Sequence, residues 1–79
     1  MNKDKLLRKI ASGSKDIKFS EFVWLLEAMG FKLDRVSGSH HIFKHPFVRE
    51  IINVQNCSGQ AKPYQIRQFL KLIERHGIR

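Results

Sequence analysis

Two short links separate three stretches with β-strand character, and they restrict how this chain can fold. The stretches cover residues 31–36, 38–45 and 50–56, and the links are 37–38 and 46–49. Gly38 can adopt a positive φ in a tight turn, and Pro46 ends a strand because it has no N–H to donate. Links this short join antiparallel neighbours, whereas parallel strands need a connection of about a dozen residues. The sequence therefore predicts a three-stranded antiparallel meander.

Amphipathic helices are predicted on both sides of these strands. Apolar side chains recur at helical spacing over residues 19–31, where Ser20 is the expected N-cap and Gly30 the expected end. A second helix is predicted over residues 63–76, which begin with a proline and precede Gly77. The two helices bury most apolar area when they cover the same face of the sheet, which leaves the other face open. The expected class is α+β, in the order α-β-β-β-α.

Residues 1–14 are predicted to form an accessory N-terminal helix and a flexible joint, because apolar residues at helical spacing precede Ser12-Gly13-Ser14. Residues 15–79 are predicted to form one main domain, since a chain of 79 residues leaves no room for a second. A single cysteine, Cys57, excludes an internal disulfide, and the N-terminus lacks the apolar run of a secretion signal. We therefore expect a cytoplasmic protein without a membrane span.

The charge balance of the chain favours a polyanionic partner. Lysine and arginine number 15 against 7 aspartate and glutamate residues, which gives a formal net charge of +8. An ordinary solvated surface carries a more even mixture of both signs. Nucleic acid is the first candidate partner, and an acidic protein is the second.

Three of the four histidines lie in the middle stretch of the predicted sheet. Side chains alternate between the two faces of a strand, so His40 and Lys44 should share one face, while His41 and His45 share the other. Only one of these histidine sets can face the solvent. No pair of histidines or cysteines has a recognised zinc spacing, so no metal and no cofactor are expected.

A solvent-facing histidine can support RNA cleavage, because RNA carries its own nucleophile. A neutral imidazole can remove the proton of a 2′-OH, and nearby cations can stabilise the charge that develops on the phosphate oxygens. From the residues alone, the His40-His41 pair is more readily interpreted as a surface feature or a phosphate contact than as a catalyst. Cys57 could act as a nucleophile only with a neighbouring base, and nothing in the sequence requires this.

The order of these features resembles the HicA toxins, which are small mRNA interferases of type II toxin–antitoxin pairs. The resemblance is carried by the helix that ends in Gly30-Phe31, by Arg35, and by the Gly38-Ser39-His40 element followed by Phe43. It implies a fold similar to the double-stranded RNA-binding domain. It also implies that His40 is the catalytic residue and that a HicB-like antitoxin binds the toxin and masks this site.

These observations lead to one main hypothesis, a metal-independent endoribonuclease with His40 as general base or acid. Arg35 and Lys44 are expected to neutralise phosphate, and the proton complementing His40 could come from His41, His45 or Tyr64. The full set of expected RNA-binding residues is Arg35, Ser39, Lys44, Lys62, Arg67 and Lys71. Two alternatives stay open: a non-catalytic RNA-binding module, and a protein-interaction module whose charge serves an acidic partner.

Overall fold

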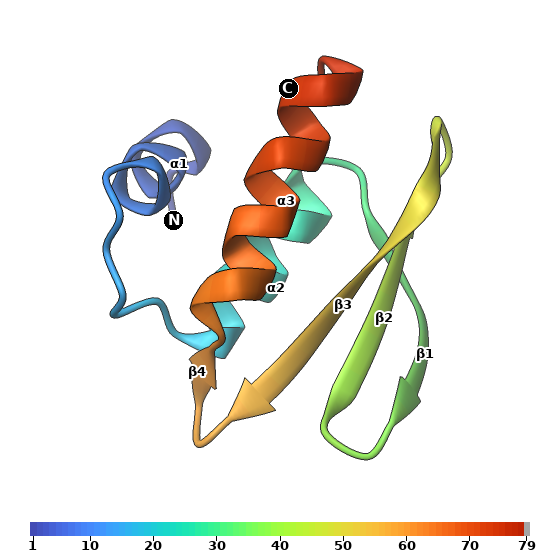
Figure 1. Ribbon diagram of the computed structural model, residues 1–79, viewed down its shortest axis with the longest axis horizontal. Coiled ribbons are helices and arrows are strands. Elements are labelled where there is room, and N and C mark those ends of the chain that lie inside the picture. Colours follow the sequence, from blue (N-terminus) through green and yellow to red (C-terminus); the bar gives the residue numbers. More distant parts are fainter. Residues whose placement is uncertain (79) are drawn as a thin grey trace.

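The computed structural model describes residues 1–78, so the last residue of the predicted domain 15–79 lies outside the described residues. Across this part of the chain, two helices precede four strands and a final helix (Figure 1). In order, the elements are α1 (Lys3–Ala11), α2 (Phe19–Ala28), β1 (Lys32–Ser37), β2 (His40–His45), β3 (Val48–Cys57), β4 (Gln60–Ala61) and α3 (Pro63–His76). The strands form one antiparallel sheet in the order β1-β2-β3-β4.

The predicted α+β class is confirmed, and both main helices lie on one side of the sheet (Figure 1). Phe43 on β2 and Ile52 and Val54 on β3 point toward the helices and are buried. They join the buried faces of α2 and α3 in one core, whose largest fully buried side chains are Phe22, Phe31, Phe43, Phe69, Ile17, Leu25, Leu26 and Val54. α1 adds Leu6 and Ile10 to this core and packs against α2. The opposite face of the sheet is therefore left without a covering helix.

Residues 57–62, which lie between the last predicted strand and the last predicted helix, contain a tight hairpin that adds the short strand β4. Ser58 and Gly59 both have positive φ, at 54° and 83°, as the two central residues of a hairpin turn require. The Ala61 N–H donates to the Ile17 carbonyl at 3.0 Å, so β4 is also held by the segment before α2. The sheet thus has one more strand than the sequence pattern predicts.

α2 begins earlier than predicted, because its N-cap is Lys18 and not Ser20. The Lys18 N–H donates to Glu21 Oε1 at 3.0 Å, which satisfies one of the free donors at the helix start. The Phe19 N–H donates to the Gly59 carbonyl at 2.9 Å. This bond to the β3–β4 turn fixes the chain at the first residue of the helix, so Ser20 falls inside the first turn.

The end of α2 closes as predicted and meets the ring of His45. Gly30 has a φ of 94°, and the Phe31 N–H donates to the Leu26 carbonyl at 3.0 Å. A Cβ atom added at Gly30 would lie 3.0 Å from His45 Nε2. The His45 ring cannot easily move away, because its Nε2 lies within hydrogen-bond distance of the Met29 carbonyl oxygen, at 3.2 Å.

Gly30→Ala is therefore expected to destabilise the protein by about 2–4 kcal/mol. An alanine with a positive φ is strained, and its Cβ would lie too close to the His45 ring. The free energy of unfolding in urea measures this loss. Gly38→Ala is the matched control: Gly38 also has a positive φ, of 60°, but no atom lies within 4 Å of its added Cβ. The control should lose only about 1–2 kcal/mol, and equal losses in the two variants would contradict the contact with His45.

Candidate active site

The strand register places His40 on the face of the sheet opposite the helices. On β2, His40 pairs with Ser37 and Gln55, and Ile42 pairs with Arg35 and Asn53. Residues directly opposite each other share a face, as do residues two apart on one strand. We call this surface the open face, and it comprises Arg35, Ser37, His40, Ile42, Lys44, Asn53 and Gln55. The register confirms the alternation predicted for β2, with His40 and Lys44 on one face and His41 and His45 on the other, and it shows that the face of His41 and Phe43 is the one that meets the helices.

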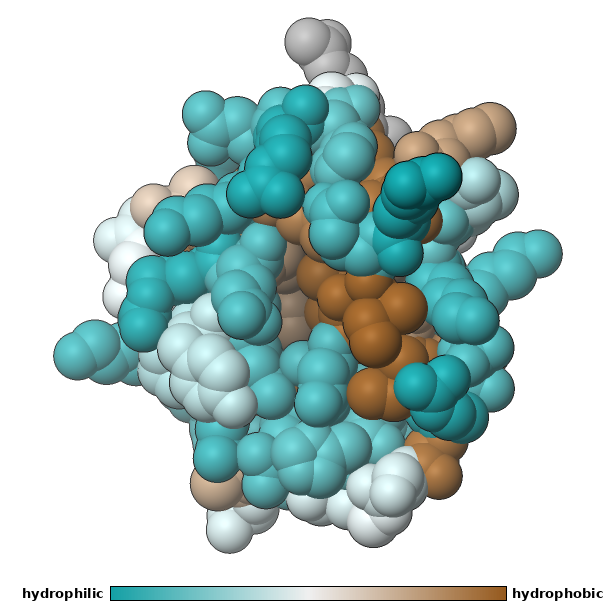
Figure 2. Space-filling view, turned by 45° about the vertical axis from the view of Figure 1, so that its right-hand side comes forward, coloured by the Kyte–Doolittle hydropathy of each residue, from teal (hydrophilic) through white to brown (hydrophobic). Residues whose placement is uncertain are grey.

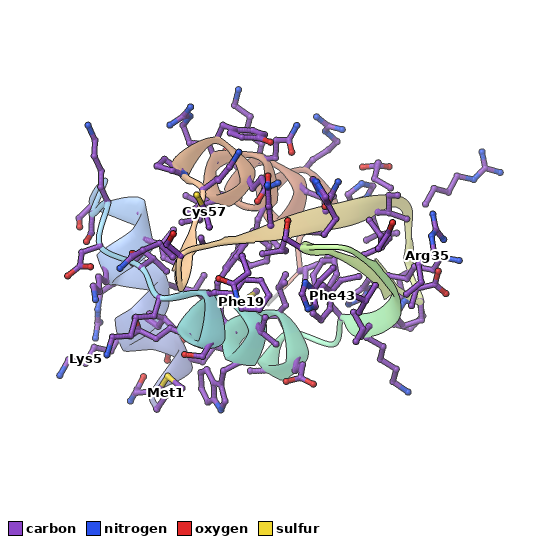
Figure 3. All side chains as sticks on the ribbon, turned by 90° about the horizontal axis from the view of Figure 1, so that it is seen from below. Met1, Lys5, Phe19, Arg35, Phe43 and Cys57 are labelled. Carbon is purple, nitrogen blue, oxygen red and sulfur yellow. The ribbon has the colours of Figure 1, made fainter. Side chains whose placement is uncertain are left out.

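Two cations of the open face share one carboxylate. Arg35 Nη1 lies 2.8 Å from Asp34 Oδ2, and Lys44 Nζ lies 3.4 Å from Asp34 Oδ1. The side chains of Arg35 and Lys44 are 61% and 56% exposed. Exposed ion pairs contribute only about 0–1 kcal/mol, so a phosphate can compete with Asp34 for these cations. In Figure 3, Arg35 points away from the body of the molecule, whereas Phe43 lies toward the helices.

His40 itself is partly exposed and held by a side chain of β3. Its Nδ1 lies 3.1 Å from Asn53 Oδ1. Because a carbonyl oxygen only accepts hydrogen bonds, this contact is a hydrogen bond when Nδ1 carries the proton. Nε2 then bears a lone pair, and within residues 1–78 no hydrogen-bond partner occupies it. A neutral ring in this tautomer can accept a proton at Nε2.

The other three histidines are engaged elsewhere. His41 faces the helices: its ring packs edge-on against Phe19 at 4.8 Å, and its Nδ1 lies 3.2 Å from the Ser39 carbonyl oxygen. His45 also faces the helices, packed against Phe31. Both of its ring nitrogens contact the backbone, since Nδ1 accepts the Phe47 N–H at 3.1 Å and Nε2 lies near Met29. Of the three histidines in β2, only His40 therefore lies on the open face.

His76, near the end of α3, contacts Glu50 on β3. His76 Nε2 lies 2.8 Å from Glu50 Oε2, and Arg75 Nη1 lies 3.5 Å from the same oxygen. The hydrogen bond from His76 holds the pKa of Glu50 below its ordinary value of 4.5, and the positive charges of His76 and Arg75 act in the same direction. A lowered pKa in the folded state stabilises the protein above pH 4.5, and this contribution is lost as the pH falls through the lowered value.

The difference in Tm between the wild type and Glu50→Gln is therefore expected to depend on pH. Near neutral pH the variant should melt slightly lower, because it lacks the charged acceptor for His76. As the pH falls below 4.5, the wild-type carboxylate takes up its proton and the difference should shrink. Thermal melts followed by circular dichroism at a series of pH values measure this. A difference that stays constant down to about pH 3 would contradict the assigned role of Glu50.

The first turn of α3 is tied to β3 at the residue opposite His40. Gln65 is only 2% exposed, and its Oε1 accepts the Gln55 N–H at 2.8 Å. Lys62 is the N-cap of α3, and its Nζ lies 6.0 Å from the centre of the Tyr64 ring. Sequence analysis did not identify Gln65, because a polar residue in an amphipathic helix gives no sign that it is buried. The hydrogen bond between Gln65 and the Gln55 N–H brings the neighbouring residues Lys62 and Tyr64 toward the edge of β3 beside the site.

The predicted RNA-binding residues fall into separate groups. Arg35 and Lys44 lie on the open face, and Ser39 lies in the exposed β1–β2 turn, where its carbonyl accepts the Asn56 N–H at 3.1 Å. Arg67 and Lys71 are exposed on α3. Lys71 lines a shallow cleft of about 260 Å³ between α3 and β3. The structure thus does not bring the α3 cations into contact with His40.

The surface on the sheet side is mixed. Figure 2, turned toward this side, shows a band of apolar side chains flanked by hydrophilic ones. Among the exposed apolar residues of the first three strands, Ile51 lies on the open face, two residues before Asn53, whereas Leu33 and Val36 pair with Phe43 and His41, which face the helices. Cys57 is exposed and free. Among residues 1–78, no three histidine, cysteine, aspartate or glutamate side chains gather as a metal site, and no helix has the length and apolar character needed to cross a membrane.

Comparison with known protein families agrees with these features. No curated protein matches the chain significantly. A family model described as the HicA toxin of bacterial toxin–antitoxin systems matches residues 19–74. The matched region runs from the start of α2 into α3, so it includes the whole sheet and the open face. A family of this kind implies an antitoxin partner. The chain therefore belongs to the HicA family of bacterial toxins.

Proposed function

We propose that this toxin is an endoribonuclease that cleaves mRNA with His40 as its general base and without a metal ion. The observation that carries the proposal is the state of the His40 ring. Its Nδ1 contacts Asn53 Oδ1 at 3.1 Å, its Nε2 has no hydrogen-bond partner among residues 1–78, and Arg35 and Lys44 lie on the same face. The other two histidines of β2 face the helices, so His40 is the histidine of β2 that a ligand on the open face can contact.

The proposed reaction uses the nucleophile that the substrate carries. His40 Nε2 removes the proton of a ribose 2′-OH, and the 2′-oxygen attacks the adjacent phosphorus. The bond from phosphorus to the 5′-oxygen breaks, and that oxygen takes up a proton from water or from a side chain at the site. The products are a 2′,3′-cyclic phosphate and a 5′-OH. Arg35 and Lys44 stabilise the charge that develops on the phosphate oxygens.

The remaining predicted residues are proposed to guide the RNA strand. Ser39 precedes His40 in the exposed turn, and Lys62 lies at the start of α3, close to the β3 edge. Arg67 and Lys71 extend the positive surface along α3. A HicB-like antitoxin would mask the open face. Residues 15–79 are proposed as the toxin domain, with residues 1–14 as an accessory element, and the cytoplasm as the site of action.

Incubation of the purified protein with a defined single-stranded RNA in EDTA tests the proposal. Fragments that carry a 2′,3′-cyclic phosphate and a 5′-OH are expected. Intact RNA that is bound with a steep salt dependence would instead favour a non-catalytic RNA-binding module. The absence of RNA binding at low salt would favour a module whose charge serves an acidic protein partner.

A further inference from the structure

Asn53 reaches His40 across the sheet through a defined cross-strand position. Gln55 lies directly opposite His40, and Asn53 is its diagonal neighbour on the same face of β3. Diagonal side chains in an antiparallel pair lie close enough for long or polar side chains to meet. Asn53 Oδ1 accordingly lies 3.1 Å from His40 Nδ1. The contact joins two adjacent strands that are buried on their other face, so its geometry depends on a rigid element and not on a loop.

The contact lies at the surface, since Asn53 is exposed and His40 is partly exposed. Beside it, Ile42, which pairs with Asn53, is only 8% exposed although it lies on the face that no helix covers. Neighbouring side chains must therefore shield Ile42 from water. A hydrogen bond at the surface contributes little to stability, so its effect is on the orientation of the ring.

We propose that Asn53 is a positioning residue, which holds His40 as the Nδ1–H tautomer with its Nε2 lone pair directed at the substrate. This inference rests on the proposed function of His40. An imidazole free to rotate, or protonated at Nε2 when neutral, cannot accept the 2′-OH proton in the same place. An amide oxygen fixes the tautomer without placing a negative charge beside the ring. Asn53 therefore orients the ring without adding a charge to the site.

The charged groups on the same face as His40 come from β1 and from β2 itself. β1 contributes Arg35 on the same face, and β2 contributes Lys44 two pairs further along. Asp34 of β1 is paired with both of these cations. On β3, the residues nearest to His40 are the neutral Asn53 and Gln55. A change in the pH dependence of cleavage on substitution of Asn53 can thus be assigned to the contact between Asn53 and His40.

Two substitutions separate positioning from packing. Asn53→Leu keeps the size of the side chain but removes the acceptor, and it should lower kcat about 10- to 100-fold while KM changes little. Asn53→Asp keeps an acceptor for the Nδ1–H and should recover most of the lost kcat. Its negative charge favours the imidazolium, so the acid limb of the pH–rate profile should move to higher pH. Gln55→Leu removes an amide that lies on the same face but makes no hydrogen bond to His40, and it should leave the shape of the profile unchanged.

The tautomer can also be observed without any substrate. Long-range ¹H–¹⁵N spectra of the wild type at a pH where His40 is neutral should show the proton on Nδ1, and this preference should be lost in Asn53→Leu. A wild-type ring protonated at Nε2, or an Asn53→Leu variant with the kcat and pH profile of the wild type, would overturn the inference. Cleavage that survives His40→Ala would instead overturn the proposed function, so the two failures are distinguishable.

Discussion

His40→Ala is expected to lower the rate of RNA cleavage by about 100- to 10,000-fold, the usual contribution of a general base. The substitution removes the imidazole that is proposed to accept the 2′-OH proton, but the cations that are proposed to bind the RNA stay in place. His40 is partly exposed and its contact with Asn53 lies at the surface, so the loss of stability should be about 1 kcal/mol or less. Single-turnover cleavage in EDTA and a thermal melt of the same preparation measure both quantities.

His76→Ala is the matched control for the loss of a histidine ring. His76 lies on α3, contacts Glu50 of β3, and is outside the open face. The control should cleave RNA at close to the wild-type rate. Cleavage by His40→Ala at the wild-type rate would refute its assignment as the base.

His45→Ala is expected to show the opposite pattern, with a loss of stability of about 2–4 kcal/mol and little change in the activity of the folded molecules. The substitution leaves the partly buried Met29 carbonyl without its ring partner, which costs about 1–3 kcal/mol, whereas water can replace the ring at the exposed Phe47 N–H. It also removes a ring that packs edge-on against Phe31. The free energy of unfolding in urea, together with the cleavage rate per folded molecule, measures these two effects.

His45→Gln provides a second comparison at the same position. A glutamine can donate to one backbone group and accept from another, so it should retain part of the stability. A His45→Ala protein as stable as the wild type would show that the two ring contacts contribute little. A large loss of cleavage rate per folded molecule would show instead that His45 takes part in the reaction.

The parts of the fold that follow from local patterns could be predicted from the sequence. The period of two in β2 correctly put His40 and Lys44 on one face and His41 and His45 on the other, and Gly30 ended α2 with the bond from Phe31 to Leu26. These features depend on residues close together in the chain. Ser20, in contrast, was wrong as the N-cap, because a bond between Phe19 and the distant Gly59 carbonyl fixes where α2 begins.

The features that sequence analysis missed all depend on contacts between distant segments. β4 is held by Ile17, which lies far from it in sequence. Gln65 is buried because its side chain satisfies the Gln55 N–H at the edge of β3. Asn53 could have been identified only from the register of β3 against β2, since a one-residue shift would move it to the other face. Motif spacing indicated His40, but not the residue that orients it.

Cleavage of two matched oligonucleotides tests the role of the substrate's own nucleophile most directly. One is a defined RNA, and the other differs only by a 2′-deoxyribose at the nucleotide whose 2′-oxygen should attack. The wild-type protein is expected to bind both but to cleave only the first. Cleavage of both at similar rates would mean that water is the nucleophile, and the proposed role of His40 as the base for a 2′-OH would be wrong.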